Sequence, residues 1–142
     1  MNSAVDYAEL PALPLALPPA KRGNGRTLAD LTAQATPAEQ RLWHALTEVM
    51  DPEYPVSVVD LGLIYAVREA AGRVSVDLTF TSMGCPCMEY ITADIRERLM
   101  QEAGVSDVAL NVVWYPAWTA RRLTDEGRAQ LARWGVGTGE AL

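Results

Sequence analysis

Residues 63–80 read LIYAVREAAGRVSVDLTF, and this stretch decides the fold. Over 73–80, valine, leucine and phenylalanine alternate with serine, aspartate and threonine, which is the pattern of a strand with one buried and one polar face. A turn at 69–72 ends in glycine and separates this strand from a second apolar run at 63–68. We therefore predict a β-hairpin.

Helices are predicted before and after the hairpin. Thr36-Pro37-Ala38-Glu39 forms a capping box, and the apolar spacing that follows predicts a helix over 37–50, which Asp51-Pro52 ends. A second helix follows the turn at 81–87, and Gly104 ends it. Its apolar face consists of Met88, Ile91, Ile95 and Leu99.

The remaining pattern completes a single small domain over 36–142. A third strand is predicted over 105–113, followed by a loop with three aromatic residues and a short helix over 125–134. The order α-β-β-α-β-α predicts the α/β (α+β) class, with a small mixed sheet and helices packed on it. Residues 1–35 are rich in proline, glycine and alanine, so we predict a flexible N-terminal arm there.

The composition excludes several classes of function. The 142 residues suit about one domain, and 12 basic against 18 acidic residues give a net charge of −6. Without a basic run, nucleic-acid binding is not expected. No stretch of about 18 apolar residues and no secretory signal are recognised, so we expect a cytoplasmic protein without a membrane partner.

The two cysteines, Cys85 and Cys87, lie where a predicted strand leads into a helix. Unpaired N–H groups at a helix start stabilise a thiolate, which can act as a nucleophile or a metal ligand, and Gly84 lets a ligand approach the backbone. This spacing strains a disulfide but suits two ligands of one metal or cluster. Alternatively, one or both cysteines are small buried hydrophobic residues.

Other candidate residues also keep two interpretations. Asp51, Glu53 and Asp60 lie in a proline-rich loop, where carboxylates can assist a metal site or bind turn amides. Trp114 and Trp118 can form a partner-binding face, although covering the core is the default role of such residues.

Four short motifs resemble, in this order, a known family. They are Asp51-Pro52-Glu53 with Pro55, Asp60-Leu61-Gly62-Leu63-Ile64-Tyr65, Thr79-Phe80-Thr81 leading to Gly84-Cys85-Pro86, and Trp114-Tyr115-Pro116-Ala117-Trp118. The chain resembles the MIP18-like domain of the SufT and PaaD iron–sulfur assembly proteins over about 37–135. It is SufT-like rather than PaaD-like, because no cysteine or histidine follows Cys87.

The resemblance implies an accessory factor in iron–sulfur cluster assembly or transfer. It places the family's cysteine at Cys85 and pocket residues at Glu53, Asp60 and Thr81, with Gly84 beside the cysteine. We expect Cys85, with Cys87 as a candidate second ligand, to bind iron or a cluster transiently. Two chains would supply four thiolates, which makes a homodimer plausible. The implied partners are other iron–sulfur assembly proteins and client apoproteins.

Two other functions stay open. A non-catalytic adaptor would contact its partners through the aromatic loop at 114–118 and keep a structural cysteine. A thiol enzyme would use Cys85 as nucleophile and would need a nearby base. The only histidine, His44, lies off the apolar stripe of another helix and is predicted to be exposed, so we expect no enzymatic activity.

Overall fold

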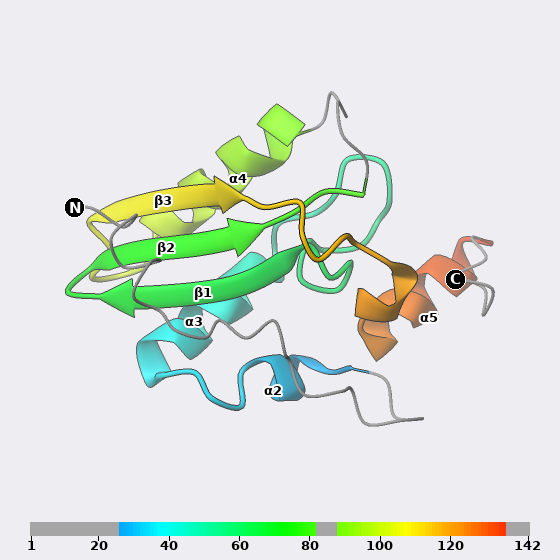
Figure 1. The fold of residues 1–142 in the computed structure, drawn as a ribbon, viewed down its shortest axis with the longest axis horizontal. Helices are drawn as coiled ribbons and strands as arrows, with labels where there is room; N and C mark the ends of the chain where they lie inside the picture. Colours follow the sequence, from blue (N-terminus) through cyan, green and yellow to red (C-terminus); the bar gives the residue numbers. More distant parts are fainter. Residues whose placement is uncertain (1–25, 82–87, 136–142) are drawn as a thin grey trace.

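The computed structural model of the chain describes residues 26–81 and 88–135. Its sheet contains three strands in the order β1-β2-β3 (Figure 1). These are β1 (Ile64–Ala70), β2 (Arg73–Leu78) and β3 (Asp107–Val112). β1 and β2 form the predicted antiparallel hairpin, whereas β2 and β3 are parallel. The prediction of a small mixed sheet is confirmed.

Two helices, α3 (Pro37–Leu46) and α4 (Met88–Met100), cover one face of this sheet (Figure 1). α3 contacts β1, α4 contacts β3, and the two helices contact each other. α4 supplies the crossover that a parallel β2–β3 pair requires. The prediction of helices packed on the sheet is therefore confirmed as well.

α3 begins as predicted but ends early. The Thr36 hydroxyl accepts a hydrogen bond from the Glu39 amide, and the Glu39 carboxylate accepts one from the Thr36 amide. The helix ends at Leu46 rather than at residue 50, because the Thr47 hydroxyl binds the His44 carbonyl and the chain turns to form a bridge between Met50 and Ser57. His44 is exposed, as predicted.

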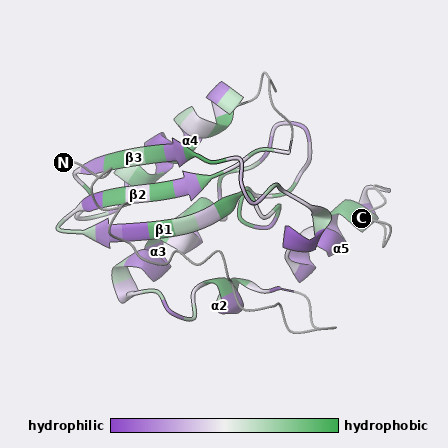
Figure 2. Cartoon of the chain, in the orientation of Figure 1, coloured by the Kyte–Doolittle hydropathy of each residue, from purple (hydrophilic) through white to green (hydrophobic). Residues whose placement is uncertain are grey.

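The core lies between the helices and the sheet. Val74, Val76, Leu78 and Phe80, the alternating residues of the predicted strand, are all at most 4 % exposed. Figure 2 shows hydrophobic residues along the middle of β2 and β3, with hydrophilic residues toward the strand ends. The period-two pattern thus identified the buried face correctly.

The predicted flexible arm is wrong over residues 26–35. This part contains a short helix, α2 (Leu28–Leu31), whose capping box joins Thr27 and Asp30 through two reciprocal hydrogen bonds. Leu28, Leu31 and Ala35 pack against the core, so the folded domain extends beyond the predicted boundary. Residues 1–25, the rest of the predicted arm, lie outside the described residues.

The C-terminal part contains one unpredicted element. A 3-10 helix, η1 (Ala120–Arg122), precedes α5 (Asp125–Arg133), the short helix predicted over 125–134. Between 26 and 135, leaving out 82–87, no helix is long and apolar enough to cross a bilayer.

Two glycines allow a test of how tightly the turn before β1 packs against η1. Both Gly62 and Gly104 have a positive φ, at 78° and 86°. A Cβ at Gly62 would lie 2.3 Å from the Arg122 carbonyl oxygen, whereas a Cβ at Gly104 would meet nothing within 4 Å. Gly62→Ala is expected to lower the free energy of unfolding by about 3 kcal/mol, from backbone strain and a backbone clash together. Gly104→Ala should cost about 1 kcal/mol from strain alone. Urea denaturation followed by circular dichroism measures both; equal losses would contradict the close packing.

Candidate functional site

The two cysteines belong to the connection between β2 and α4. Cys85 and Cys87, together with Gly84, lie in 82–87 and therefore outside the described residues. The structure does describe both ends of this connection, namely the segment up to Thr81 and the first turn of α4 at Met88. The candidate site is therefore described through the residues that flank 82–87.

The chain leading toward the cysteines is held on two sides. The Thr79 amide donates to the Leu63 carbonyl at 2.8 Å, and the Val113 amide donates to the Leu78 carbonyl at 2.8 Å. The first bond joins the residue after β2 to the residue before β1. The second joins the last residue of β2 to the residue after β3. The approach to 82–87 is therefore fixed by backbone hydrogen bonds that continue both strand pairings.

Two neighbouring threonines differ in their surroundings. Thr81, the predicted pocket residue, is exposed. Thr79 is 1 % exposed, and its hydroxyl has no hydrogen-bond partner among the described residues. A buried hydroxyl without a partner costs about 1–3 kcal/mol of stability. Among the residues that flank 82–87, Thr79 is therefore buried at an energetic cost. The alternation of 73–80 placed Thr79 on the polar face and gave no sign of this burial.

Asp60 is engaged within the fold. Its carboxylate accepts hydrogen bonds from the Ser57 hydroxyl at 3.0 Å and the Thr124 hydroxyl at 2.6 Å, and its carbonyl accepts one from the Thr124 amide at 3.0 Å. A Cβ at Gly127 would lie 2.4 Å from the same carbonyl oxygen, so α5 packs directly on this turn. These contacts favour the turn interpretation of Asp60, which also lines a pocket together with Arg26, Thr47 and Thr124.

The other acidic residues of this loop are not brought to Asp60 by any described hydrogen bond. The Asp51 carboxylate accepts from the amides of Glu53 and Tyr54 at 2.6 and 3.1 Å, as expected of a residue that binds turn amides. Glu53 itself is exposed. In the two described segments, no group of three or more histidine, cysteine, aspartate or glutamate residues is placed to hold a metal ion.

The two predicted partner-binding tryptophans are placed differently. Trp118 is half-buried against the core, and its indole N–H donates to the Leu61 carbonyl at 2.7 Å. Trp114 is 40 % exposed, with its ring 6.2 Å from the buried ring of Phe80. Trp118 therefore covers the core, while Trp114 forms an exposed apolar surface next to the chain that leads to the cysteines.

Sequence reasoning missed an arginine–tyrosine contact at the root of β1. The Arg122 guanidinium lies 3.8 Å from the centroid of the Tyr65 ring, and its Nε donates to the Gly62 carbonyl at 2.9 Å. The Tyr65 hydroxyl donates to the Pro116 carbonyl. Burial, and then the nearby charge of Arg26, lower the pKa of Arg122 to about 10, and burial raises the pKa of Tyr65. Arg122 thus remains charged at neutral pH and ties η1 to the start of β1.

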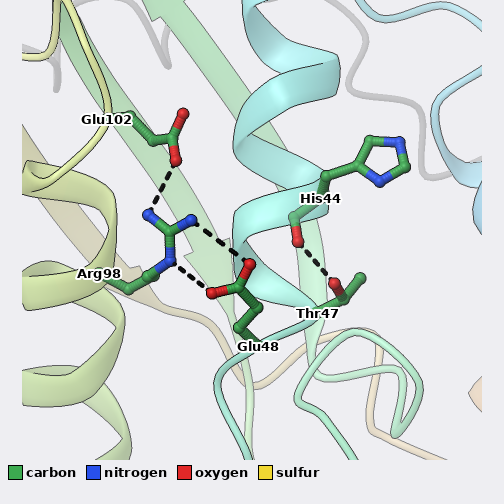
Figure 3. A network of polar contacts seen from close by, with 5 residues as sticks. All are labelled: His44, Thr47, Glu48, Arg98 and Glu102. Atoms are coloured by element: carbon green, nitrogen blue, oxygen red, sulfur yellow. Dashed lines mark hydrogen bonds and ion pairs between the residues drawn. The ribbon is translucent and has the colours of Figure 1, made fainter.

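A polar network joins the C-terminal end of α4 to the residues after α3 (Figure 3). Arg98 lies 3.0 Å from the Glu48 carboxylate and 2.8 Å from that of Glu102. The hydrogen bond from Arg98 lowers the pKa of Glu48. Because this network lies at the opposite end of α4 from Met88, it supports the fold rather than the candidate site.

The chain forms a small mixed α/β domain. In the sequence, its two cysteines lie between the end of β2 and the start of α4. The family model described as iron–sulfur cluster assembly protein matches residues 39–112, and the chain belongs to this family.

Several of its relatives are named Fe-S protein maturation auxiliary factors, and SufT is among them. The chain is 36% identical over 94 residues to an Fe-S protein maturation auxiliary factor of Porphyromonas gingivalis, which covers 66% of this chain and 90% of that protein. It is 40% identical over 72 residues to the Fe-S protein maturation auxiliary factor SufT of Staphylococcus aureus, covering 50% of this chain and 82% of that protein. A solved domain of unknown function from Bacillus anthracis superposes with a TM-score of 0.63 at 33% identity, covering 66% of this chain and 91% of that one.

Truncation of the two tryptophans is expected to lower the stability of the fold by different amounts. Trp118→Ala should lower the free energy of unfolding by about 3 kcal/mol, because it removes core contacts and leaves the Leu61 carbonyl without its donor. Trp114→Ala should cost about 1 kcal/mol, because much of this side chain is in water. Chemical denaturation compares the two variants; a larger loss for Trp114→Ala would contradict the assignment of Trp118 to core cover.

Proposed function

We propose that this chain binds iron or an iron–sulfur cluster transiently through Cys85, with Cys87 as a second thiolate, and passes it to client apoproteins. Membership of the iron–sulfur cluster assembly family and relatives named as maturation auxiliary factors support this role.

The proposal rests on the position of the two cysteine thiols in the chain. Cys85 and Cys87 are its only cysteines, and both fall in the connection 79–87 between β2 and α4. Thiolates are the preferred ligands of iron–sulfur clusters. Within 26–81 and 88–135, no group of three or more histidine, cysteine, aspartate or glutamate residues could hold a metal ion, and the proposal therefore assigns the iron to these two thiolates.

Two thiolates make half of a four-thiolate site, and this explains why the binding would be transient. A second chain or a client would supply the remaining ligands. Transfer is then ligand exchange: a client thiolate forms a bond to iron as the bond to Cys85 breaks. The proton lost by the client thiol balances the proton gained by Cys85, and iron keeps its oxidation state. No catalytic base is needed, which agrees with a non-enzymatic factor.

A second candidate function is an adaptor that bridges the assembly machinery and its clients while the cysteines remain structural. The exposed side chains at the end of β3 favour this alternative, because Trp114 is 40 % and Tyr115 77 % exposed. Apolar aromatic side chains left in water next to a candidate site are typical of partner-binding surfaces.

Reconstitution separates the two functions. Under anaerobic conditions with iron and sulfide, the chain is expected to acquire visible absorbance from thiolate-to-iron charge transfer, and Cys85→Ser/Cys87→Ser should lose it. Trp114→Ala serves as the matched control and should keep the absorbance.

The same samples test whether two chains share the cargo. Sedimentation before and after reconstitution should show a shift from one chain to two that depends on both thiols. If the chain gains no absorbance, or the double cysteine variant keeps it, cluster binding through Cys85 and Cys87 is wrong and the adaptor function is favoured.

A further inference from the structure

We propose that the outer edge of β3 binds an extended segment of a client protein as a fourth strand of the sheet. This inference rests on the proposed role in delivering a cluster to clients and names how a client is held. The segment carries apolar side chains on the helix-covered face and basic side chains on the other.

The edge consists of the outward-facing backbone of Val108, Leu110 and Val112. Because the Asp107 and Val113 amides donate to carbonyls at the two ends of β2, alternation turns the amides of the residues at 108, 110 and 112 away from β2. These three amides have no hydrogen-bond acceptor among the described residues. A row of outward amides and carbonyls is a template for another strand.

The opposite edge of the sheet is closed. On β1, the outward Glu69 amide donates to the Glu39 carboxylate of α3 at 3.1 Å. A register shift between Ile64 and Ala66 also interrupts this strand, and Arg122 lies over the intervening Tyr65 ring. β3 carries none of these devices: it has no register shift, and its sequence DVALNV contains neither proline nor lysine. Strand addition is therefore directed to β3.

On the helix-covered face of β3, exposure rises toward the chain that leads to 82–87. Val108 is 7 % exposed, whereas Val112 is 39 % exposed and Trp114, just beyond it, is 40 % exposed. In the parallel register Val112 pairs with Leu78, so the accessible end of β3 lies beside the chain that leads to 82–87. An added strand would lie about 10 Å from β2, two strand spacings away. A client thiol just beyond that strand is thus brought to the end of the sheet where β2 ends at Leu78 and the chain continues toward 82–87.

A client segment fits this edge better than a second copy of the chain. Six residues span roughly 20 Å and cover on the order of 200 Å² per partner, well below the ~800 Å² of a stable interface. Two copies paired through β3 about a twofold axis would also put the Leu78 ends of their β2 strands, from which the chain continues toward 82–87, at opposite ends of the joint sheet. The net charge of −6 favours a segment with basic residues.

The test uses the full chain with Cys85→Ser/Cys87→Ser, so that it does not depend on cluster binding. The probe is a synthetic eight-residue peptide of alternating valine and arginine with blocked ends, and a peptide with two valines replaced by proline is its control. Val112→Pro removes one outward donor at a position where an edge strand tolerates proline, whereas Val112→Ala keeps the donor. Binding is followed by amide chemical shifts and hydrogen exchange.

We expect the alternating peptide to shift and protect the Leu110 and Val112 amides, and the proline peptide to do neither. Val112→Pro should bind at least fivefold more weakly, and Val112→Ala should bind within about twofold of the parent, because the lost group is one backbone hydrogen-bond donor. If Val112→Pro does not fold, protection of the two amides in the parent decides the question.

Three results would overturn the inference. These are perturbation centred away from β3, equal binding by Val112→Pro, and a dimer without peptide that Val112→Pro dissociates, which would assign the edge to a second copy. Cluster reconstitution of Val112→Pro with both cysteines intact tests the proposed function separately.

Discussion

Asp60 holds the C-terminal part of the chain against the root of the hairpin, and the rest of the structure depends on this clamp. Its carboxylate binds the hydroxyls of Ser57 and Thr124, and its carbonyl binds the Thr124 amide. Around it, Gly62 packs against Arg122 and the Trp118 indole binds the Leu61 carbonyl. A compact turn with so many satisfied polar groups positions η1 and α5, and it fixes where β1 begins.

The end of the sheet where β2 and β3 finish is the one next to the candidate site. Because β2 and β3 are parallel, their ends meet at the same side, where Leu78 pairs with Val112. The connection that carries the cysteines begins there, next to Trp114 and the accessible end of β3. An exposed aromatic side chain and an open strand edge therefore come from separate parts of the sequence, and both lie beside the chain that leads to 82–87, the segment that contains the two cysteines.

The fold was predictable where the sequence pattern is local. The alternation in 73–80 and the capping box at 36–39 identified a strand and a helix start correctly, because side-chain period and end capping act over a few residues. The end of α3 and the extent of the arm were predicted wrongly. In both places distant contacts decided the outcome: the bridge between Met50 and Ser57, and the packing of Leu28 against the core.

The sequence by itself determined the hairpin, the mixed sheet with its helices, the absence of a four-thiolate site within one chain, and the resemblance on which the functional proposal began. Only the tertiary structure decided what the motif residues contact. Asp60 and Trp118 turned inward to bind backbone and hydroxyl groups more than 50 residues away, whereas Trp114 stayed exposed. Hydrogen bonding and burial of a side chain depend on which distant segment packs against it, and neither spacing nor residue type contains that information.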